Sequence, residues 1–191
     1  MDMRDFIFRN RSYIPIPLAL TIIYFAGKGN LYPFGFSLII IGELLRLNGV
    51  RYAGGATRTR NVGVQTLCTS GPFAYVRNPL YLGNVILYLG IVLVAGGDYW
   101  VTIMMVTALF FLIQYGLIIS LEEKTLKREL GEPYILYYNA VPRIFPMLTR
   151  WKEGKTASPR SWANTLKIEK RTLQTLLGFL LLLLVRIQLF N

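Results

Sequence analysis

The 191-residue chain is 53% hydrophobic, with a mean hydropathy of +0.43 and a formal net charge of +11. Because it has one cysteine and no histidine, an intrachain disulfide, His-based zinc or non-haem iron sites, and Ser-His-Asp or Cys-His catalysis are excluded. The apolar residues form long blocks rather than amphipathic stripes, which indicates an integral membrane protein.

The apolar blocks have lengths suited to membrane helices. A helix needs about 20 residues to cross the hydrocarbon core. The first block is short, but it reaches this length if the helix begins near Phe6. We therefore predict an all-α integral membrane protein with five transmembrane helices, over residues 13–26, 31–50, 80–97, 99–121 and 173–190.

The positive charges are distributed unevenly along this chain. Lys and Arg gather in the N-terminal segment, in the connection after the second helix and between residues 124 and 171, whereas the other connections hold Lys28 and Asp98. Cytoplasmic connections are enriched in Lys and Arg. The pattern predicts an N-in, C-out orientation, with the basic zones against anionic membrane lipids rather than nucleic acid.

Two polar segments bracket the third and fourth predicted helices. The first covers residues 71–83, and the second runs from Glu122 and Glu123 to Pro146. The turn between the helices, Gly96-Gly97-Asp98, is short enough to make them antiparallel neighbours, so the two polar segments lie on the same side. Charge at the membrane edge is costly, and we expect a functional site there.

Local signals refine this picture. Asn78 followed by Pro79 is typical of a helix start, with Asn as the N-cap and Pro at the first helical position. Glu43 and Arg46 share a helix face, which predicts an ion pair that either supports packing or faces a ligand. Past residue 123 an amphipathic segment continues the helix, broken at Gly131 and predicted to form an interfacial tail.

The chemistry of the polar segments suggests a cationic ligand. Acidic residues at a helix C-terminus oppose the macrodipole, so Glu122 and Glu123 are better suited to a cation or to ribose hydroxyls than to a solvated helix end. Four tyrosines serve either as interfacial belt residues or as stacking surface for a cationic aromatic cofactor: Tyr75, Tyr81, Tyr134 and Tyr137.

The order and spacing of these residues resemble a known superfamily. Residues 71–83 read Gly-Pro-Phe-x-Tyr-x-Arg-Asn-Pro-x-Tyr-x-Gly, the acidic pair follows, and Gly-Glu-x-Tyr-x-x-Tyr and Val-Pro-Arg-x-x-Pro begin at 131 and 141. This pattern is similar to the isoprenylcysteine carboxyl methyltransferase and phospholipid methyltransferase superfamily. The resemblance defines a core of residues 65–147 in one membrane domain, flanked by residues 1–64, a basic segment 148–172 and a terminal helix 173–191.

The resemblance implies transfer of a methyl group from S-adenosylmethionine to a lipidic acceptor that enters from the bilayer. It implies a cytoplasmic cofactor pocket beneath the helix 3–helix 4 hairpin, closed by the tail, in a bacterial inner membrane or an ER-type membrane, without a metal. By position, Arg77 and Arg143 would be catalytic, and the cofactor contacts would come from Tyr75, Asn78, Pro79, Tyr81, Gly83, Glu122, Glu123, Tyr134 and Tyr137.

Asn78 departs from the superfamily pattern, which usually has His at this position. Asn does not titrate near neutral pH and cannot act as a general base. A carboxylate acceptor needs no base, and Arg77 or Arg143 could hold it. A phospholipid amine would need Glu122, Glu123 or a tyrosine to take its proton, so the absence of His favours a prenylcysteine-like carboxylate or another neutral or anionic small lipid.

Other functions remain alternatives. An NADPH-dependent membrane reductase of the sterol-reductase type would suit the basic zones, although the acidic pair would repel a dinucleotide. A phospholipid amine N-methyltransferase and a non-catalytic membrane adaptor are the other two readings. The adaptor reading does not account for the polar segment 71–83.

Overall fold

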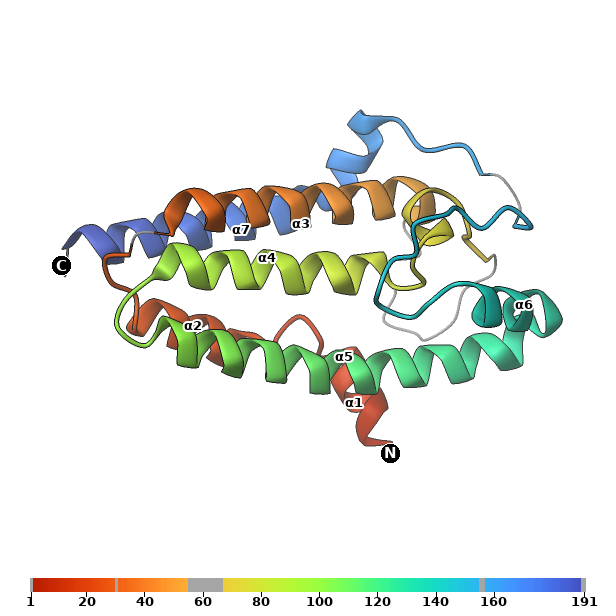
Figure 1. Ribbon diagram of the computed structural model, residues 1–191, viewed down its shortest axis with the longest axis horizontal. Coiled ribbons are helices and arrows are strands. Elements are labelled where there is room, and N and C mark those ends of the chain that lie inside the picture. The colour runs from red at the N-terminus through yellow and green to blue at the C-terminus, as the bar shows by residue number, and fades with distance from the viewer. Residues whose placement is uncertain (1, 30, 55–66, 155–156, 190–191) are drawn as a thin grey trace.

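The computed structural model describes residues 2–29, 31–54, 67–154 and 157–189, which form helices and connecting segments with no strand among them. Four long helices run side by side, and a short helix and connecting segments gather at one end (Figure 1). The elements are α1 (Met3–Arg9), α2 (Ile16–Tyr24), α3 (Tyr32–Ala53), the 3₁₀ helix η2 (Gly71–Ala74), α4 (Pro79–Ala95), α5 (Trp100–Leu130), α6 (Glu132–Ala140) and α7 (Trp162–Leu189). The predicted all-α class is confirmed.

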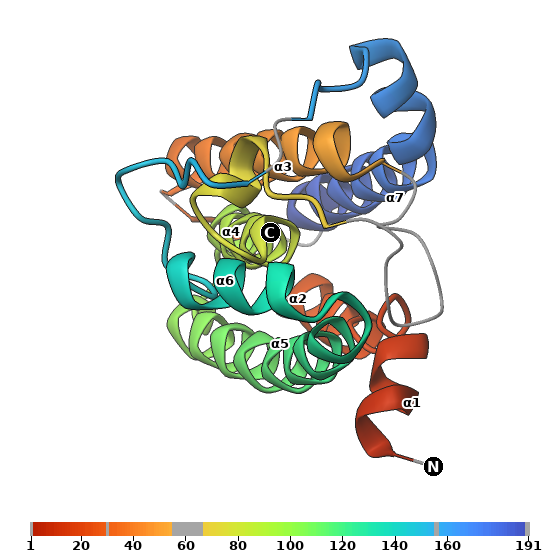
Figure 2. The same ribbon diagram turned by 90° about the vertical axis from the view of Figure 1, so that its right-hand side faces the viewer.

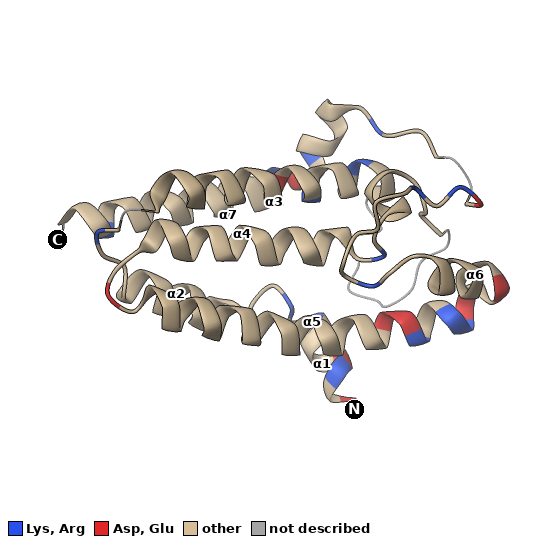
Figure 3. Cartoon of the chain, viewed as in Figure 1, with Lys and Arg blue, Asp and Glu red and all other residues tan. Residues whose placement is uncertain are grey.

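The long helices are suited to a membrane. In the described residues, α3, α5 and α7 are long and apolar enough to cross a bilayer, and α4 is apolar but has only 17 residues. The protein is therefore an integral membrane protein. Five spans and the N-in orientation remain predictions. In Figure 3 the segments coloured for charged residues are concentrated toward the α6 end, as the charge pattern predicts.

The prediction of one continuous first helix is wrong, because α1 and α2 are separate. The Asn10 side chain donates to the Phe6 carbonyl at 2.9 Å where α1 ends. Pro15 then stands at the N-cap of α2 and Pro17 follows in its first turn, and neither can donate a backbone hydrogen bond to a preceding turn. With nine residues, α2 spans only about 14 Å.

Glycines set the distance between α3 and α4. A Cβ built on Gly42 would lie 2.7 Å from the Gly83 carbonyl oxygen, and one built on Gly35 would lie 2.8 Å from that of Gly90. Both pairs repeat at seven-residue spacing, so small residues face each other along the interface and the backbones approach closely. Seen end-on, α4 lies in the middle of the bundle, packed against α3, α5 and α7 (Figure 2).

The hairpin and the last helix complete the fold. Gly96 and Gly97, with φ of 59° and 77°, form the turn between α4 and α5, and the predicted antiparallel pair is confirmed. The predicted Glu43–Arg46 pair is also confirmed, at 2.6 Å, and Arg46 contacts Glu169 of α7 at 3.0 Å.

Two predicted segments differ from the structure or lie beyond it. The last helix begins at Trp162 rather than at residue 173, so the end of the predicted basic segment is helical. The predicted loop residues 55–66, with Arg58 and Arg60, lie outside the described residues.

Candidate active site

The segment after α6 folds back over the start of α4, and we call residues 141–151 the strap. Three backbone hydrogen bonds fasten it to residues 74–77. The Arg77 N–H donates to the Pro142 carbonyl at 2.9 Å, and the strap returns bonds of 3.0 Å from Met147 to Tyr75 and from Trp151 to Ala74. Two regions far apart in the sequence are thereby held together beside the hairpin.

A buried ion cluster lies beneath the strap. Glu123 of α5 accepts from Arg77 Nη2 at 2.9 Å and from Arg143 Nε at 3.1 Å through Oε1, while its Oε2 pairs with Arg143 Nη2. The side chains of Glu123 and Arg77 are only 7% and 8% exposed, whereas that of Arg143 is 44% exposed. Arginines thus bind both oxygens of Glu123. The hydrogen bond between Arg143 and Glu123 raises the pKa of Arg143 above its ordinary value.

Arg77 also binds the backbone through Nη1, whereas its buried Nε has no hydrogen-bond partner among the described residues. Its Nη1 donates to the Val141 carbonyl at 2.7 Å and also to the Tyr138 carbonyl. Its guanidinium carbon lies 4.0 Å from the centre of the Tyr138 ring, a cation–π contact. Arg77 therefore links α5, the end of α6 and the strap.

Glu122 has a different environment from its neighbour. Its Oε1 accepts a hydrogen bond from the Tyr81 hydroxyl of α4 at 3.0 Å, and Tyr81 is its only hydrogen-bond donor within the described part of the chain. The Tyr81 ring lies 4.6 Å from that of Tyr115, whose hydroxyl accepts from Asn84 at 3.0 Å. The second oxygen of Glu122 accepts no hydrogen bond from the described residues.

Asn78 stands at the N-cap position of α4, but its predicted capping role is wrong. The side chain makes no cap bond to the helix. Its amide instead donates to the Arg143 carbonyl at 3.0 Å, so Asn78 holds the strap. Pro79 occupies the first helical position as predicted and is buried.

The predicted tyrosines separate into two groups. Tyr134 and Tyr137 are buried in α6, where burial raises the pKa of both hydroxyls, so they remain neutral donors. The Tyr137 hydroxyl donates to the Phe73 carbonyl at 2.7 Å. Tyr75 is 38% exposed, and its backbone carbonyl accepts a hydrogen bond from Met147 of the strap.

The structure brings most of the predicted residues to one end of the bundle, where Arg77, Asn78, Tyr81, Glu122, Glu123 and Arg143 are joined through the contacts above. Gly83 is placed elsewhere, since a Cβ there would lie 2.6 Å from Arg46 Cγ of α3. Sequence reasoning missed Tyr138, whose ring also lies 3.4 Å from Lys127 Nζ. The four-residue spacing between Tyr134 and Tyr138 could have indicated that both lie on the same face of α6.

Comparisons with known proteins identify the family of this chain. Residues 31–132 match the family described as phospholipid methyltransferase, a span that includes α3, α4, α5 and both glutamates of the pair. A search of curated proteins and a search of solved structures each found no match. The match covers more than half of the chain and ends before the strap. The chain belongs to the phospholipid methyltransferase family, whose members are enzymes that transfer methyl groups to lipids.

Proposed function

We propose that this protein transfers the methyl group of S-adenosylmethionine to a lipidic acceptor that reaches the strap end of the bundle from the membrane. The proposal rests on the different hydrogen-bond partners of the adjacent carboxylates Glu122 and Glu123. Both oxygens of Glu123 are bound by two arginines, whereas Glu122 accepts one hydrogen bond, from Tyr81, and its second oxygen would contact the ligand. Family membership supports the reaction class.

The residues present fit this cofactor, which carries a sulfonium cation and ribose hydroxyls. The Glu122 carboxylate accepts one hydrogen bond from Tyr81. It could accept another from a ribose hydroxyl, or attract the sulfonium cation. Glu122 and Tyr81 would therefore contact the cofactor directly. We propose that Asn78, Glu123, Tyr134 and Tyr137 act indirectly, by holding the strap and α6 in place.

S-adenosylmethionine supplies an activated methyl group, so the protein has to align the acceptor and exclude water. The strap covers the start of α4 and provides the exclusion. Arg143 is partly exposed and can hold an anionic group of the acceptor, whereas Arg77 has its described bonds within the protein and is a positioning residue. A carboxylate acceptor reacts without a base, which suits Asn78.

A phospholipid amine is the second acceptor class. The description of the family favours it, and so does Glu122, which could take the proton that an ammonium must lose before it attacks. The family match does not favour the NADPH-dependent reductase.

Calorimetric titration of the detergent-purified chain with S-adenosylmethionine, S-adenosylhomocysteine and NADPH tests the cofactor. We expect saturable binding of the first two compounds and none of NADPH. Absence of binding by both methionine-derived compounds, in protein that unfolds cooperatively, would overturn the proposal. Binding of NADPH alone would favour the reductase.

A further inference from the structure

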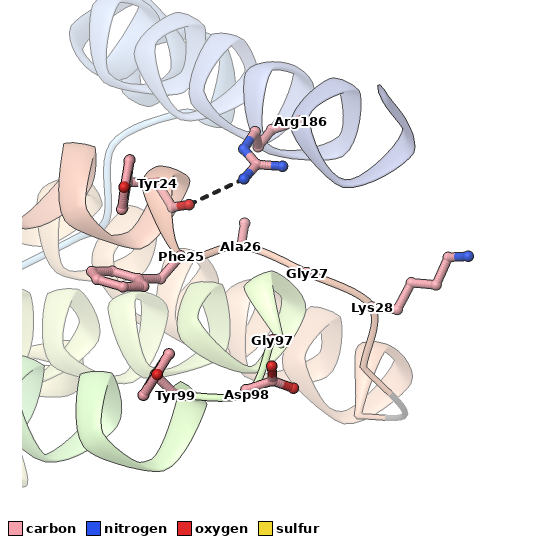
Figure 4. A pocket seen from close by; sticks show the side chains of 9 residues that line it. All are labelled: Tyr24, Phe25, Ala26, Gly27, Lys28, Gly97, Asp98, Tyr99 and Arg186. Carbon is pink, nitrogen blue, oxygen red and sulfur yellow. Dashed lines mark hydrogen bonds between the residues drawn. The ribbon is translucent and has the colours of Figure 1, made fainter. Parts of the chain in front are cut away.

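A pocket lies at the end of the bundle opposite the strap (Figure 4). Its volume is about 350 Å³, and its walls come from the segment Tyr24–Lys28, from the α4–α5 turn and from Arg186 of α7. The first two walls are joined by hydrogen bonds from Gly27 to the Ala95 carbonyl at 2.9 Å and from Gly97 to the Lys28 carbonyl at 3.3 Å. Backbone hydrogen bonds thus join two of the walls of the pocket.

The charges in this pocket have both signs. Lys28 and Arg186 are positive, and Asp98 is negative. Arg186 Nη2 donates to the Tyr24 carbonyl at 3.2 Å, which holds the guanidinium at the wall, and Figure 4 shows Arg186 and Asp98 on opposite sides of residues 25–28. In the described part of the chain, Asp98 and Lys28 line the same pocket without an ion pair to each other.

The position of the pocket corresponds to lipid headgroups. α3 and α5 begin here and α4 and α7 end here, so membrane-crossing helices place the pocket at a bilayer surface. Tyr24 and Tyr99 at its edge are 72% and 60% exposed, as amphipathic aromatic residues are at membrane interfaces. The Phe25 ring lies between them, with centroid distances of 4.9 Å and 5.5 Å.

We propose that this pocket binds the headgroup of a zwitterionic phospholipid in the leaflet opposite the candidate active site. The phosphate contacts Arg186 and Lys28, and the ammonium group contacts Asp98. Charge-assisted hydrogen bonds of this kind are among the stronger polar contacts. Lipid bound here would join the ends of α2 and α7 to the α4–α5 turn. Binding of this lipid does not depend on methyl transfer.

Native mass spectrometry of the full, delipidated chain with equal amounts of phosphatidylethanolamine and phosphatidylglycerol tests the site. We expect the wild type to retain the zwitterionic lipid preferentially. Arg186→Gln should lower this retention about three- to tenfold, since one charge-assisted bond at a partly exposed site is lost. Lys28→Gln, in an exposed turn, should lower it in the same direction and serves if Arg186→Gln fails to fold.

Asp98→Asn distinguishes a headgroup site from a simple anion site. It should reduce the preference for phosphatidylethanolamine over phosphatidylglycerol, because only the former has an ammonium group. Arg171→Gln is the matched control, since it removes the same charge from an exposed position of α7. Equal loss in Arg186→Gln and Arg171→Gln, an unchanged lipid ratio in Asp98→Asn, or displacement of the lipid by inorganic phosphate would overturn the proposal. Glu122→Gln should retain the lipid even if methyl transfer is absent.

Discussion

Two adjacent glutamates of α5, which continues beyond them to Leu130, have different surroundings although their side chains are identical. Glu123 lies between Arg77 and Arg143, and Glu122 faces Tyr81 across the hairpin. The sequence predicted both as site residues but could not distinguish their contacts, because these depend on which face of α5 meets α4 and which meets the strap. Sequence patterns also could not predict that the carbonyls of Tyr138 and Val141 accept hydrogen bonds from Arg77.

Glu122→Gln is expected to weaken S-adenosylmethionine binding about tenfold while leaving stability nearly unchanged. A hydrogen bond to a charged group contributes about 1.5–3 kcal/mol, and the amide keeps one acceptor. Titration calorimetry measures the effect. The control is Glu129→Gln on the same helix, where the side chain is 37% exposed and 3.7 Å from Arg128. Equal affinities in the two variants would contradict the role of Glu122.

The two arginines of the cluster should differ in their effects on stability. Arg77→Ala removes a buried partner of Glu123 and two bonds to carbonyls, so we expect a loss of about 3 kcal/mol. Arg143→Ala should cost at most about 1 kcal/mol, because the exposed guanidinium is screened by solvent. Denaturant unfolding in detergent compares them, and a larger loss in Arg143→Ala would refute the positioning role of Arg77.

At the scale of elements, the start of α4 is held in place by its packing on α3. The sequence correctly indicated the α4–α5 hairpin, because the turn is short and the flanking runs are apolar. It did not indicate which face of α4 meets α3, although Gly35 and Gly42, and Gly83 and Gly90, recur at the same spacing. Spacing within one helix does not reveal the register of its partner. The break between α1 and α2 was missed because hydrophobicity outweighed Pro15 and Pro17.

Gly42→Ala should destabilise the protein by about 1–3 kcal/mol, because the new Cβ would meet backbone atoms of α4 rather than a movable side chain. Gly116→Ala in α5 is the matched control. A Cβ there has nothing within 4 Å, so helix propensity should make this variant equal to the wild type or up to about 1 kcal/mol more stable. Unfolding curves that coincide for the two variants would exclude close α3–α4 packing.

For the whole molecule, orientation decides which face carries the chemistry. The strap end holds most of the charged residues and the opposite end holds the pocket near Asp98 (Figure 3). The uneven distribution of Lys and Arg was readable from the sequence, and it predicts the strap end in the cytoplasm. The joining of α7 to α3 through Glu169 and Arg46 was not readable, since it links residues 123 positions apart.

Cysteine labelling tests this orientation in a Cys68→Ser background. A membrane-impermeant maleimide should label Asp98→Cys in intact cells and Glu129→Cys only after the membrane is opened, because these exposed sites lie at opposite ends of α5. The reverse pattern would place the strap on the outer side. Labelling of both sites in intact cells would contradict a membrane-crossing α5.

Methyl transfer to a lipid is measured most directly by following a labelled methyl group. The purified chain is incubated with methyl-labelled S-adenosylmethionine and lipid vesicles that contain either a phospholipid amine or a prenylcysteine carboxylate. We predict label in the lipid fraction with the wild type and Glu129→Gln, and a loss of at least about tenfold with Glu122→Gln. No label in either lipid, from folded protein that binds the cofactor, would contradict the account.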